Sequence, residues 1–259
     1  MVKAAVSRAG GGSPPASFRS VRPGWLIGFA LGGFFDGILL HQILQWHHLL
    51  SLVDGVSDQV LFDGLFHALM YIVAGAGLVG LVRSRTALSQ PGSGRRLLAA
   101  ALVGAGLWHV LDGVLSHWLL GIHRIKLDST NPLFWDVAWF VVFGVASILL
   151  GVGLDRTRRG RVPGRNIALG LGVAALIGGG WAARPPANAD TAIVFFAPGT
   201  SQSEAVNAIV ASHGRLLWQS AGVWAVRWNG RPKSALLYRN NALFVSSSLG
   251  GAGCFAWSK

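Results

Sequence analysis

The chain has 259 residues, of which 52% are hydrophobic and only 12% are charged, and its formal net charge is +12. A soluble domain usually carries about 25% charged residues, so this composition excludes an ordinary soluble protein and indicates contact with a lipid bilayer. The basic residues lie in short loops between apolar runs, a pattern typical of membrane topology rather than of nucleic-acid binding. Cys254 is the single cysteine, which excludes an intrachain disulfide framework.

Long apolar runs dominate the first two thirds of the chain. Residues 1–23 precede them, lack the features of a signal peptide and are expected to form a disordered cytoplasmic tail. A membrane-spanning helix needs roughly 20 mostly apolar residues. Four runs meet this length and predict a four-helix membrane bundle over residues 24–155: about Trp25–Trp46, Leu61–Val82, Leu97–Leu120 and Leu133–Leu154. After a basic loop at 156–165, the Gly-rich run 166–183 predicts a fifth transmembrane helix.

The predicted loops differ in their content of lysine and arginine, which accumulate on the cytoplasmic side of a membrane. The basic segments carry Lys3, Arg8, Arg19 and Arg22, then Arg83, Arg85, Arg95 and Arg96, then Arg156, Arg158, Arg159, Arg161 and Arg165. The first loop between helices has no basic residue and the third has only Arg124 and Lys126. We therefore expect a plasma (inner) membrane protein with a cytoplasmic N-terminus and residues 184–259 in the periplasm.

The segment 184–259 reads as a small α+β domain. Strand-like stretches alternate with two short helical ones, the first opened by the capping-box pattern Ser201-Gln202-Ser203-Glu204,. The order β-α-β-β-α-β predicts a ferredoxin-like sandwich. It contains no cluster of carboxylates and only one histidine, His213, which we interpret as a helix-end residue. A binding or docking role is therefore expected for this domain, with Cys254 as an ordinary buried thiol.

The membrane part contains an internal repeat. The pattern D-G-x-x-x-H-x-x-L-x-x-H runs from Asp36 to His47 in the first predicted helix and from Asp112 to His123 in the third. The two helices run in the same direction, so the pattern predicts a tandem two-helix repeat that forms the four-helix bundle. A bundle of this kind can build a site from side chains on facing helices.

Polar side chains within these helices are the candidate site residues, because charged groups inside a membrane carry a cost of several kcal/mol, about 2.5–3.5 for aspartate. His41, His67 and His117 lie at similar depth near the outer ends of their helices and are expected to converge. His47, His48 and His123 at the rim are further candidate ligands. The groups expected to orient the ligands or to relay protons are Asp36, Asp112, Asp63, Asp136 and His109.

The spacing along one helix limits how these residues can combine. Asp36 and His47 are eleven residues apart in the first predicted helix, where they share a face but lie roughly 16 Å apart, so they cannot ligate one ion together. Any site is therefore expected to form between helices. Neutral imidazole suits copper, zinc and iron, and we expect a metal ion, copper in the first place, with zinc, iron or haem as alternatives. A lone histidine at a helix end is also a common interfacial residue.

Two stretches resemble a known family. They are Gly33-Phe34-Phe35-Asp36-Gly37-Ile38-Leu39-Leu40-His41-Gln42-Ile43-Leu44-Gln45-Trp46-His47-His48 and the pair Asp112-Gly113 with His117-Trp118-Leu119-Leu120-Gly121-Ile122-His123-Arg124-Ile125. They resemble an uncharacterised family of predicted four-helix bacterial membrane proteins, a domain of unknown function, over about Gly24–Leu154. Members occur near assembly factors for haem–copper oxidases, which implies copper handling or oxidase maturation. The C-terminal module lies outside the resemblance.

Four functions remain open at this point. The first is copper handling, with a respiratory oxidase or its assembly factors as partners besides the lipid bilayer. The second is a membrane redox protein with haem b or two iron ions. The third is a proton-coupled transporter that uses Asp36, Asp112 and His109 and forms a homo-oligomer. The fourth is an anchor for the outer domain. Whether any reaction is catalysed stays open.

Overall fold

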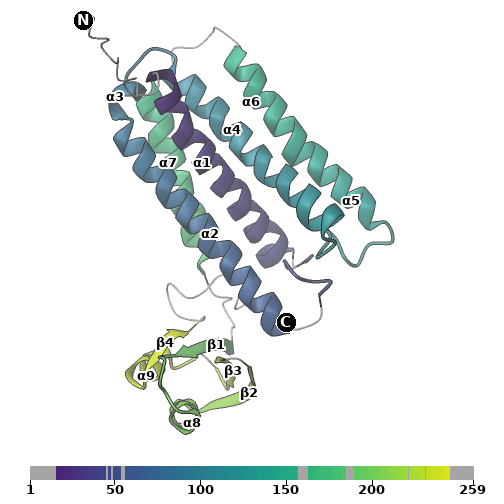
Figure 1. The fold of residues 1–259 in the computed structure, drawn as a ribbon, viewed down its shortest axis with the longest axis vertical. Coiled ribbons are helices and arrows are strands. Elements are labelled where there is room, and N and C mark those ends of the chain that lie inside the picture. The colour runs from purple at the N-terminus through teal and green to yellow at the C-terminus, as the bar shows by residue number, and fades with distance from the viewer. Residues whose placement is uncertain are drawn as a thin grey trace, which may run out of the picture.

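The computed structural model describes residues 16–44, 46–47, 49–53, 56–156, 163–184, 190–220, 222–230 and 232–245. Figure 1 shows two parts, a bundle of long helices and a small domain of strands and short helices. Residues 1–15 of the predicted tail, His48 and Cys254 lie outside the described residues.

The bundle consists of long helices, three of which contain π-helical turns labelled η. Its elements are α1 (Ala16–Asp36), η1 (Gly37–Ile43), α2 (Val56–Arg83), α3 (Arg85–Leu88), α4 (Ser93–Asp112), η2 (Gly113–Leu119), α5 (Pro132–Trp139), η3 (Phe140–Val145), α6 (Ala146–Arg156) and α7 (Gly164–Ala182). α1 starts at Ala16, earlier than the tail boundary predicted at residue 23, and its Pro23 is buried against Gly80 of α2.

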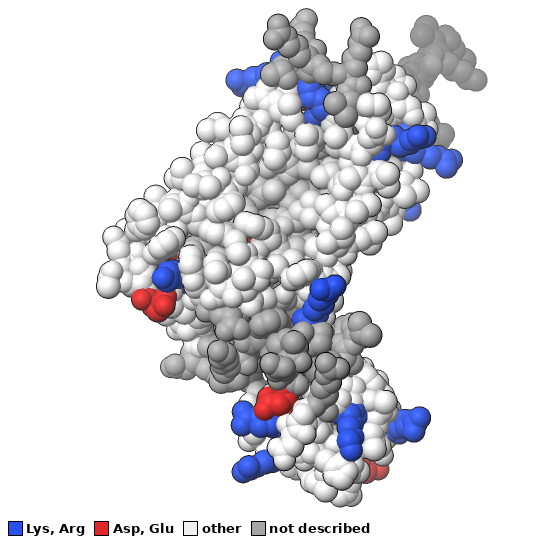
Figure 2. Space-filling view, turned by 180° about the vertical axis from the view of Figure 1, so that it is seen from behind, with Lys and Arg blue, Asp and Glu red and all other residues white. Residues whose placement is uncertain are grey.

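Four helical segments are long and apolar enough to cross a membrane: Val21–Ile43, Phe62–Arg83, Ser93–Leu119 and Pro132–Arg156. They confirm the four predicted membrane helices. On the face drawn in Figure 2, Lys and Arg gather near one end of the bundle and on the small domain, a few charged side chains lie near the other end of the bundle, and the surface between the two ends is largely uncharged. α7 is not among these four segments, so its crossing of the membrane stays a prediction.

α1 and α4 pack closely because small residues line their interface. A Cβ at Gly28 of α1 would overlap the carbonyl of Ala101, and a Cβ at Gly104 of α4 would overlap the carbonyl of Trp25. Such small-residue contacts let helix backbones approach within a membrane. The contact places the ends of α1 and α4, and so η1 and η2, beside each other in the bundle.

The two repeated motifs adopt the same local structure. Each Asp-Gly pair leads into a π-helical turn, η1 or η2, a type of turn that often marks functional sites. Each turn ends in the same way, since the N–H of Leu44 donates to Leu39 at 2.9 Å and the N–H of Leu120 donates to Leu115 at 2.8 Å. Beyond these residues the chain leaves the helix at equivalent positions in both repeats.

The C-terminal domain has the predicted ferredoxin-like order. Its elements are β1 (Thr191–Phe196), α8 (Gln202–Ala211), β2 (Gly214–Ser220), β3 (Val223–Trp228), α9 (Ser234–Arg239) and β4 (Ala242–Val245). The antiparallel sheet has the order β2-β3-β1-β4. Its core includes Val194, Ile209, Trp224 and Leu237, so this domain has a hydrophobic core separate from the bundle.

The capping box of α8 supports a prediction about this domain. The Ser201 hydroxyl accepts from the Glu204 N–H, and the Ser201 N–H donates to Glu204 Oε2 at 2.8 Å. The Ser201 N–H, and then the Ser201 hydroxyl, which donates to the same carboxylate oxygen at 2.7 Å, lower the pKa of Glu204 below its ordinary value of 4.5. Because the folded-state pKa is the lower one, this contribution to stability is present above the ordinary value and is lost as the pH falls through the folded-state pKa.

We expect Ser201→Ala to weaken the first turn of α8 by about 1 kcal/mol. Hydrogen–deuterium exchange of the peptide 201–211 in the full-length protein checks this, with Thr200→Ala as the control. The difference from wild type should shrink as the pH falls through the Glu204 pKa. Equal protection of wild type and Ser201→Ala at neutral pH would contradict it.

Candidate metal centre

Six buried side chains form two sets of possible metal ligands at one end of the bundle. The first set is Asp36, His41 and His47, and the second is Asp112, His117 and His123. Within each set, one ligand atom of every residue lies within 4.8 Å of the others. Exposed fractions are only 1–6%. Each set comes from one copy of the repeated motif and contains two imidazoles and one carboxylate.

The first set corrects the spacing expected from the sequence. A continuous helix would hold Asp36 and His47 too far apart for one ion, but η1 ends at Ile43. The chain then turns back, and His47 returns toward Asp36 to a position where both offer a ligand atom within 4.8 Å. The prediction that these two residues cannot ligate one ion is therefore wrong, because the helix does not continue to Trp46.

The second set shows the closest convergence of donor atoms. His117 Nε2 lies 3.2 Å from Asp112 Oδ2 and 3.1 Å from His123 Nε2. His123 Nε2 lies 3.6 Å from Asp112 Oδ1. These separations match neighbouring corners of a coordination shell, because zinc and similar ions bind nitrogen and oxygen at about 2.0–2.2 Å.

The first set contains two buried polar atoms that lack a hydrogen-bond partner among the described residues, Asp36 Oδ1 and His47 Nε2. The other carboxylate oxygen of Asp36 accepts a long hydrogen bond of 3.4 Å from Trp108 Nε1. The His41 and His47 rings lie 4.8 Å apart, centre to centre. Buried polar atoms without partners are uncommon in folded proteins, and here both belong to residues of one ligand set.

Reciprocal hydrogen bonds between the repeats fix two of the imidazoles. His47 Nδ1 bonds the carbonyl of Ile125, and His123 Nδ1 bonds the carbonyl of Leu49, both at 2.9 Å. A carbonyl only accepts, so each Nδ1 carries the proton and each Nε2 keeps its lone pair for a metal. The two rings stack with centres 4.6 Å apart.

Asp63 and Asp136 hold the loops that carry these carbonyls. Asp63 Oδ1 accepts from the Leu49 N–H and Asp136 Oδ1 accepts from the Ile125 N–H, both at 2.9 Å. Asp136 also lies 3.0 Å from His117 Nδ1 and accepts from Arg124 at 2.8 Å. The two carboxylates therefore orient ligand-bearing segments.

The surroundings of His47 keep its imidazole neutral. Burial, and then the neighbouring His123 imidazole, lower the pKa of His47 to about 3. His47 is therefore neutral at pH 7, which is the form of imidazole that binds metal ions.

The three histidines that were expected to converge do not share one set. His41 and His117 fall in different sets, and His67 belongs to neither. His67 Nδ1 bonds the carbonyl of Asp63 at 3.0 Å, and its Nε2 lies 3.1 Å from where a Cβ on Gly37 would stand. His109 Nδ1 accepts from Trp139 Nε1 at 3.1 Å. We did not predict from the sequence that Asp36 and Asp112 each pair with the histidines of their own motif, although the repeated motif indicates this pairing.

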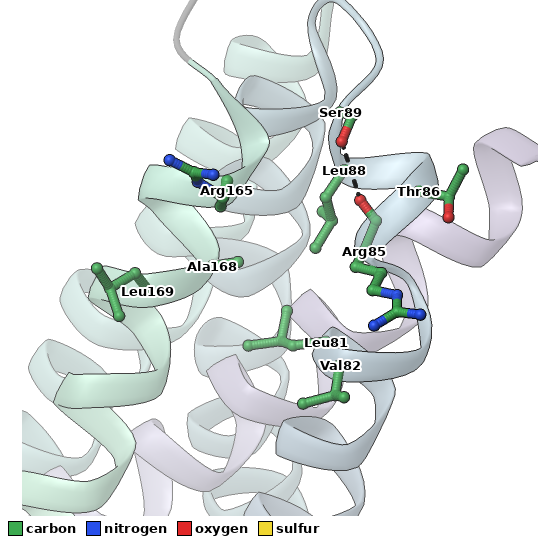
Figure 3. A pocket seen from close by; sticks show the side chains of 9 residues that line it. All are labelled: Leu81, Val82, Arg85, Thr86, Leu88, Ser89, Arg165, Ala168 and Leu169. Carbon is green, nitrogen blue, oxygen red and sulfur yellow. Dashed lines mark hydrogen bonds between the residues drawn. The ribbon is translucent and has the colours of Figure 1, made fainter.

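A groove of about 530 Å³ lies near the other end of the bundle, where α2 ends and α7 begins. Figure 3 shows that Arg85 and Arg165 flank this groove, with Leu81, Leu88 and Ala168 between them. Its lining contains no histidine and no carboxylate. The groove is therefore separate from the two ligand sets and is not a candidate metal site.

A family model described as "Predicted membrane protein (DUF2243)" matches residues 23–158. This range contains all six residues of the two ligand sets. No curated protein matches the chain, and no solved structure does.

Proposed function

The chain belongs to this DUF2243 family of predicted membrane proteins, and we propose that it is a membrane metalloprotein with its centre at the two ligand sets. The observation that carries the proposal is the pair of histidines whose Nδ1 atoms are bound to carbonyls of the opposite repeat. Both Nε2 atoms thereby keep a lone pair, that of His47 without a hydrogen-bond partner among the described residues and that of His123 3.1 Å from His117 Nε2, inside a buried cluster that also contains Asp36 and Asp112.

A metal ion explains the first ligand set better than a purely structural hydrogen-bond network does. A buried polar group without a partner carries a cost of about 1–3 kcal/mol, and Asp36 Oδ1 and His47 Nε2 are two such groups. In a structural network, these atoms would be expected to pair with one another or with the backbone. A cation bound between them satisfies both.

The donor types favour some metals over others. Two imidazoles with one carboxylate form the pattern of non-haem iron(II) sites, while imidazole alone also suits zinc and copper. Thiolate and thioether ligands, which select copper(I), are missing from both sets. We place iron first, then zinc and copper(II). His117 and His123 cannot be the two axial ligands of one haem, because their Nε2 atoms lie 3.1 Å apart and leave no room for a macrocycle between them.

Copper handling for oxidase assembly is the second candidate. Four of the six donors are imidazoles, which bind copper well, and the cluster lies near the end of the bundle. A carrier must release its metal, whereas a resident centre retains it. Resistance to chelators therefore separates the two functions.

The test is the metal content and visible spectrum of the full-length protein, purified in mild detergent before and after dialysis against EDTA. We expect a stoichiometric transition metal that survives dialysis. Copper lost to the chelator would support the handling role instead. A Soret band would replace the proposal with a cytochrome, and a protein that stays empty after reconstitution with iron, zinc and copper would overturn it.

We also propose that the cluster faces the outer side of the plasma membrane. The support is the uneven distribution of lysine and arginine, since Arg83, Arg85, Arg95 and Arg96 lie at the opposite end from the cluster. Ser203 of α8 and Ser89 beside α3 are both exposed and offer a matched pair of probes.

In a Cys254→Ser background, a membrane-impermeant maleimide added to intact cells should label Ser203→Cys and spare Ser89→Cys. After lysis, both variants should be labelled. The reverse pattern in intact cells would contradict the proposed orientation, and labelling of neither position in intact cells would place the small domain on the cytoplasmic side.

A further inference from the structure

The two ligand sets are built as the two halves of one centre. Each residue of the first motif matches the residue 76 positions later, as Asp36 matches Asp112. The contacts between the repeats follow the same offset, since His47 bonds Ile125 while His123 bonds Leu49. Within each repeat an aspartate supports the loop, because Asp63 accepts from Leu49 and Asp136 accepts from Ile125. Each repeat thus helps to orient one ligand of the other.

Six donors exceed what one ion needs, since zinc sites use four ligands and catalytic sites often use three protein ligands. Each set separately supplies three donors within 4.8 Å. The sets also touch, because the rings of His47 and His123 stack with centres 4.6 Å apart at an interplanar angle of 16°. Ions held by adjoining sets would be near neighbours, and two-metal sites hold their ions about 3.5–4 Å apart.

We infer that the cluster is a dinuclear centre, with one metal ion held by Asp36, His41 and His47 and a second held by Asp112, His117 and His123. This inference rests on the proposed function and adds the number of ions and their positions. One ion belongs to each repeat, so the duplicated motif builds a pair of sites.

The two halves differ in the groups behind the ligands. In the second half, Asp136 lies 3.0 Å from His117 Nδ1 and also binds Arg124. A carboxylate behind a ligating histidine raises its basicity and fixes its orientation. In the first half, the only hydrogen bond to Asp36 among the described contacts comes from Trp108 at 3.4 Å. The donor atoms of the second half also lie only 3.1–3.6 Å apart, so we expect the second half to be the tighter site and to fill first.

The experiment is a titration of the metal-free, full-length protein with Co²⁺, followed by visible absorption and electron paramagnetic resonance. We expect two equivalents to bind in two steps. The second equivalent should weaken the resonance signal of the first, because neighbouring cobalt ions couple magnetically. Asp112→Ala should abolish the tighter step, and Asp36→Ala should abolish the weaker one.

The wild-type titration decides the inference even if a variant fails to fold. One equivalent at saturation would overturn the dinuclear centre while leaving the proposed metalloprotein intact. No bound cobalt, zinc or iron would overturn both. Two equivalents without magnetic coupling would show two separate sites and would also contradict the inference.

Discussion

Asp136→Ala is expected to lower the free energy of unfolding of the metal-free protein by about 3 kcal/mol. Asp136 is 1% exposed, and its removal leaves the Ile125 N–H and His117 Nδ1 buried beside an empty space. Breaking a buried charged pair from one side usually has an effect of about 3–5 kcal/mol. We take the lower end because the Arg124 side chain is 33% exposed and can turn to solvent,.

The measurement is unfolding in mixed micelles with increasing SDS, in metal-free samples so that lost metal binding does not contribute. Asp128→Ala is the matched control, because its side chain is 79% exposed and lies 3.9 Å from Lys126. It should change the stability by less than about 0.5 kcal/mol. If both variants unfold at the wild-type SDS concentration, Asp136 does not hold the loop in the way described.

The second large effect concerns metal affinity. We expect His123→Gln to weaken binding by more than roughly 100-fold, because even outer partners of metal ligands contribute 10–100-fold. Glutamine can still donate to the Leu49 carbonyl that His123 Nδ1 now bonds, so the loop keeps a partner while the imidazole ligand is lost. Competition with a chelator of known affinity measures the change.

His213→Asn is the matched control for this loss of a histidine. His213 is exposed in the small domain and has a φ of 58°, a backbone region that asparagine tolerates well. Its replacement should leave metal affinity unchanged. Equal affinities for His123→Gln and wild type would remove His123 from the proposed centre.

The sequence predicted the membrane part and the small domain well, because their signals are local and strong. Apolar runs long enough to span a membrane predicted the four helices, and the capping box at Ser201 together with the strand pattern predicted the ferredoxin-like order. The starts and ends of the helices were less accurate, as for α1, where Ala16 precedes the predicted boundary. Glycine, serine and basic residues near that end resemble a tail even where a helix has begun.

The arrangement of the site was harder to predict, because it depends on where a helix stops. In the second repeat, Gly121 has a φ of 61° and marks the turn after Leu120. The first repeat has Gln45 at the matching position, so nothing local ends the predicted helix there. An alignment of Leu44 with Leu120 in the repeated motif would have predicted that both helices end at this position. His47 would then have been placed outside the helix, where it can approach Asp36.

Contacts between distant segments could not be predicted from the spacing of residues along each helix. The sequence grouped His41, His67 and His117 by depth, whereas the structure groups the histidines by repeat and leaves His67 beside Gly37. The reciprocal bonds of His47 and His123 to backbone carbonyls depend on the close packing of α1 on α4. No periodicity in the sequence encodes such a contact.

The most direct test of the proposed metal centre is X-ray absorption at the K-edge of the metal that co-purifies with the full-length protein. We expect a first shell of nitrogen and oxygen at about 2.0–2.2 Å, outer-shell scattering from imidazole rings and a metal–metal distance near 3.5–4 Å. A first shell dominated by sulfur at about 2.3 Å, or a protein without a metal edge, would contradict it.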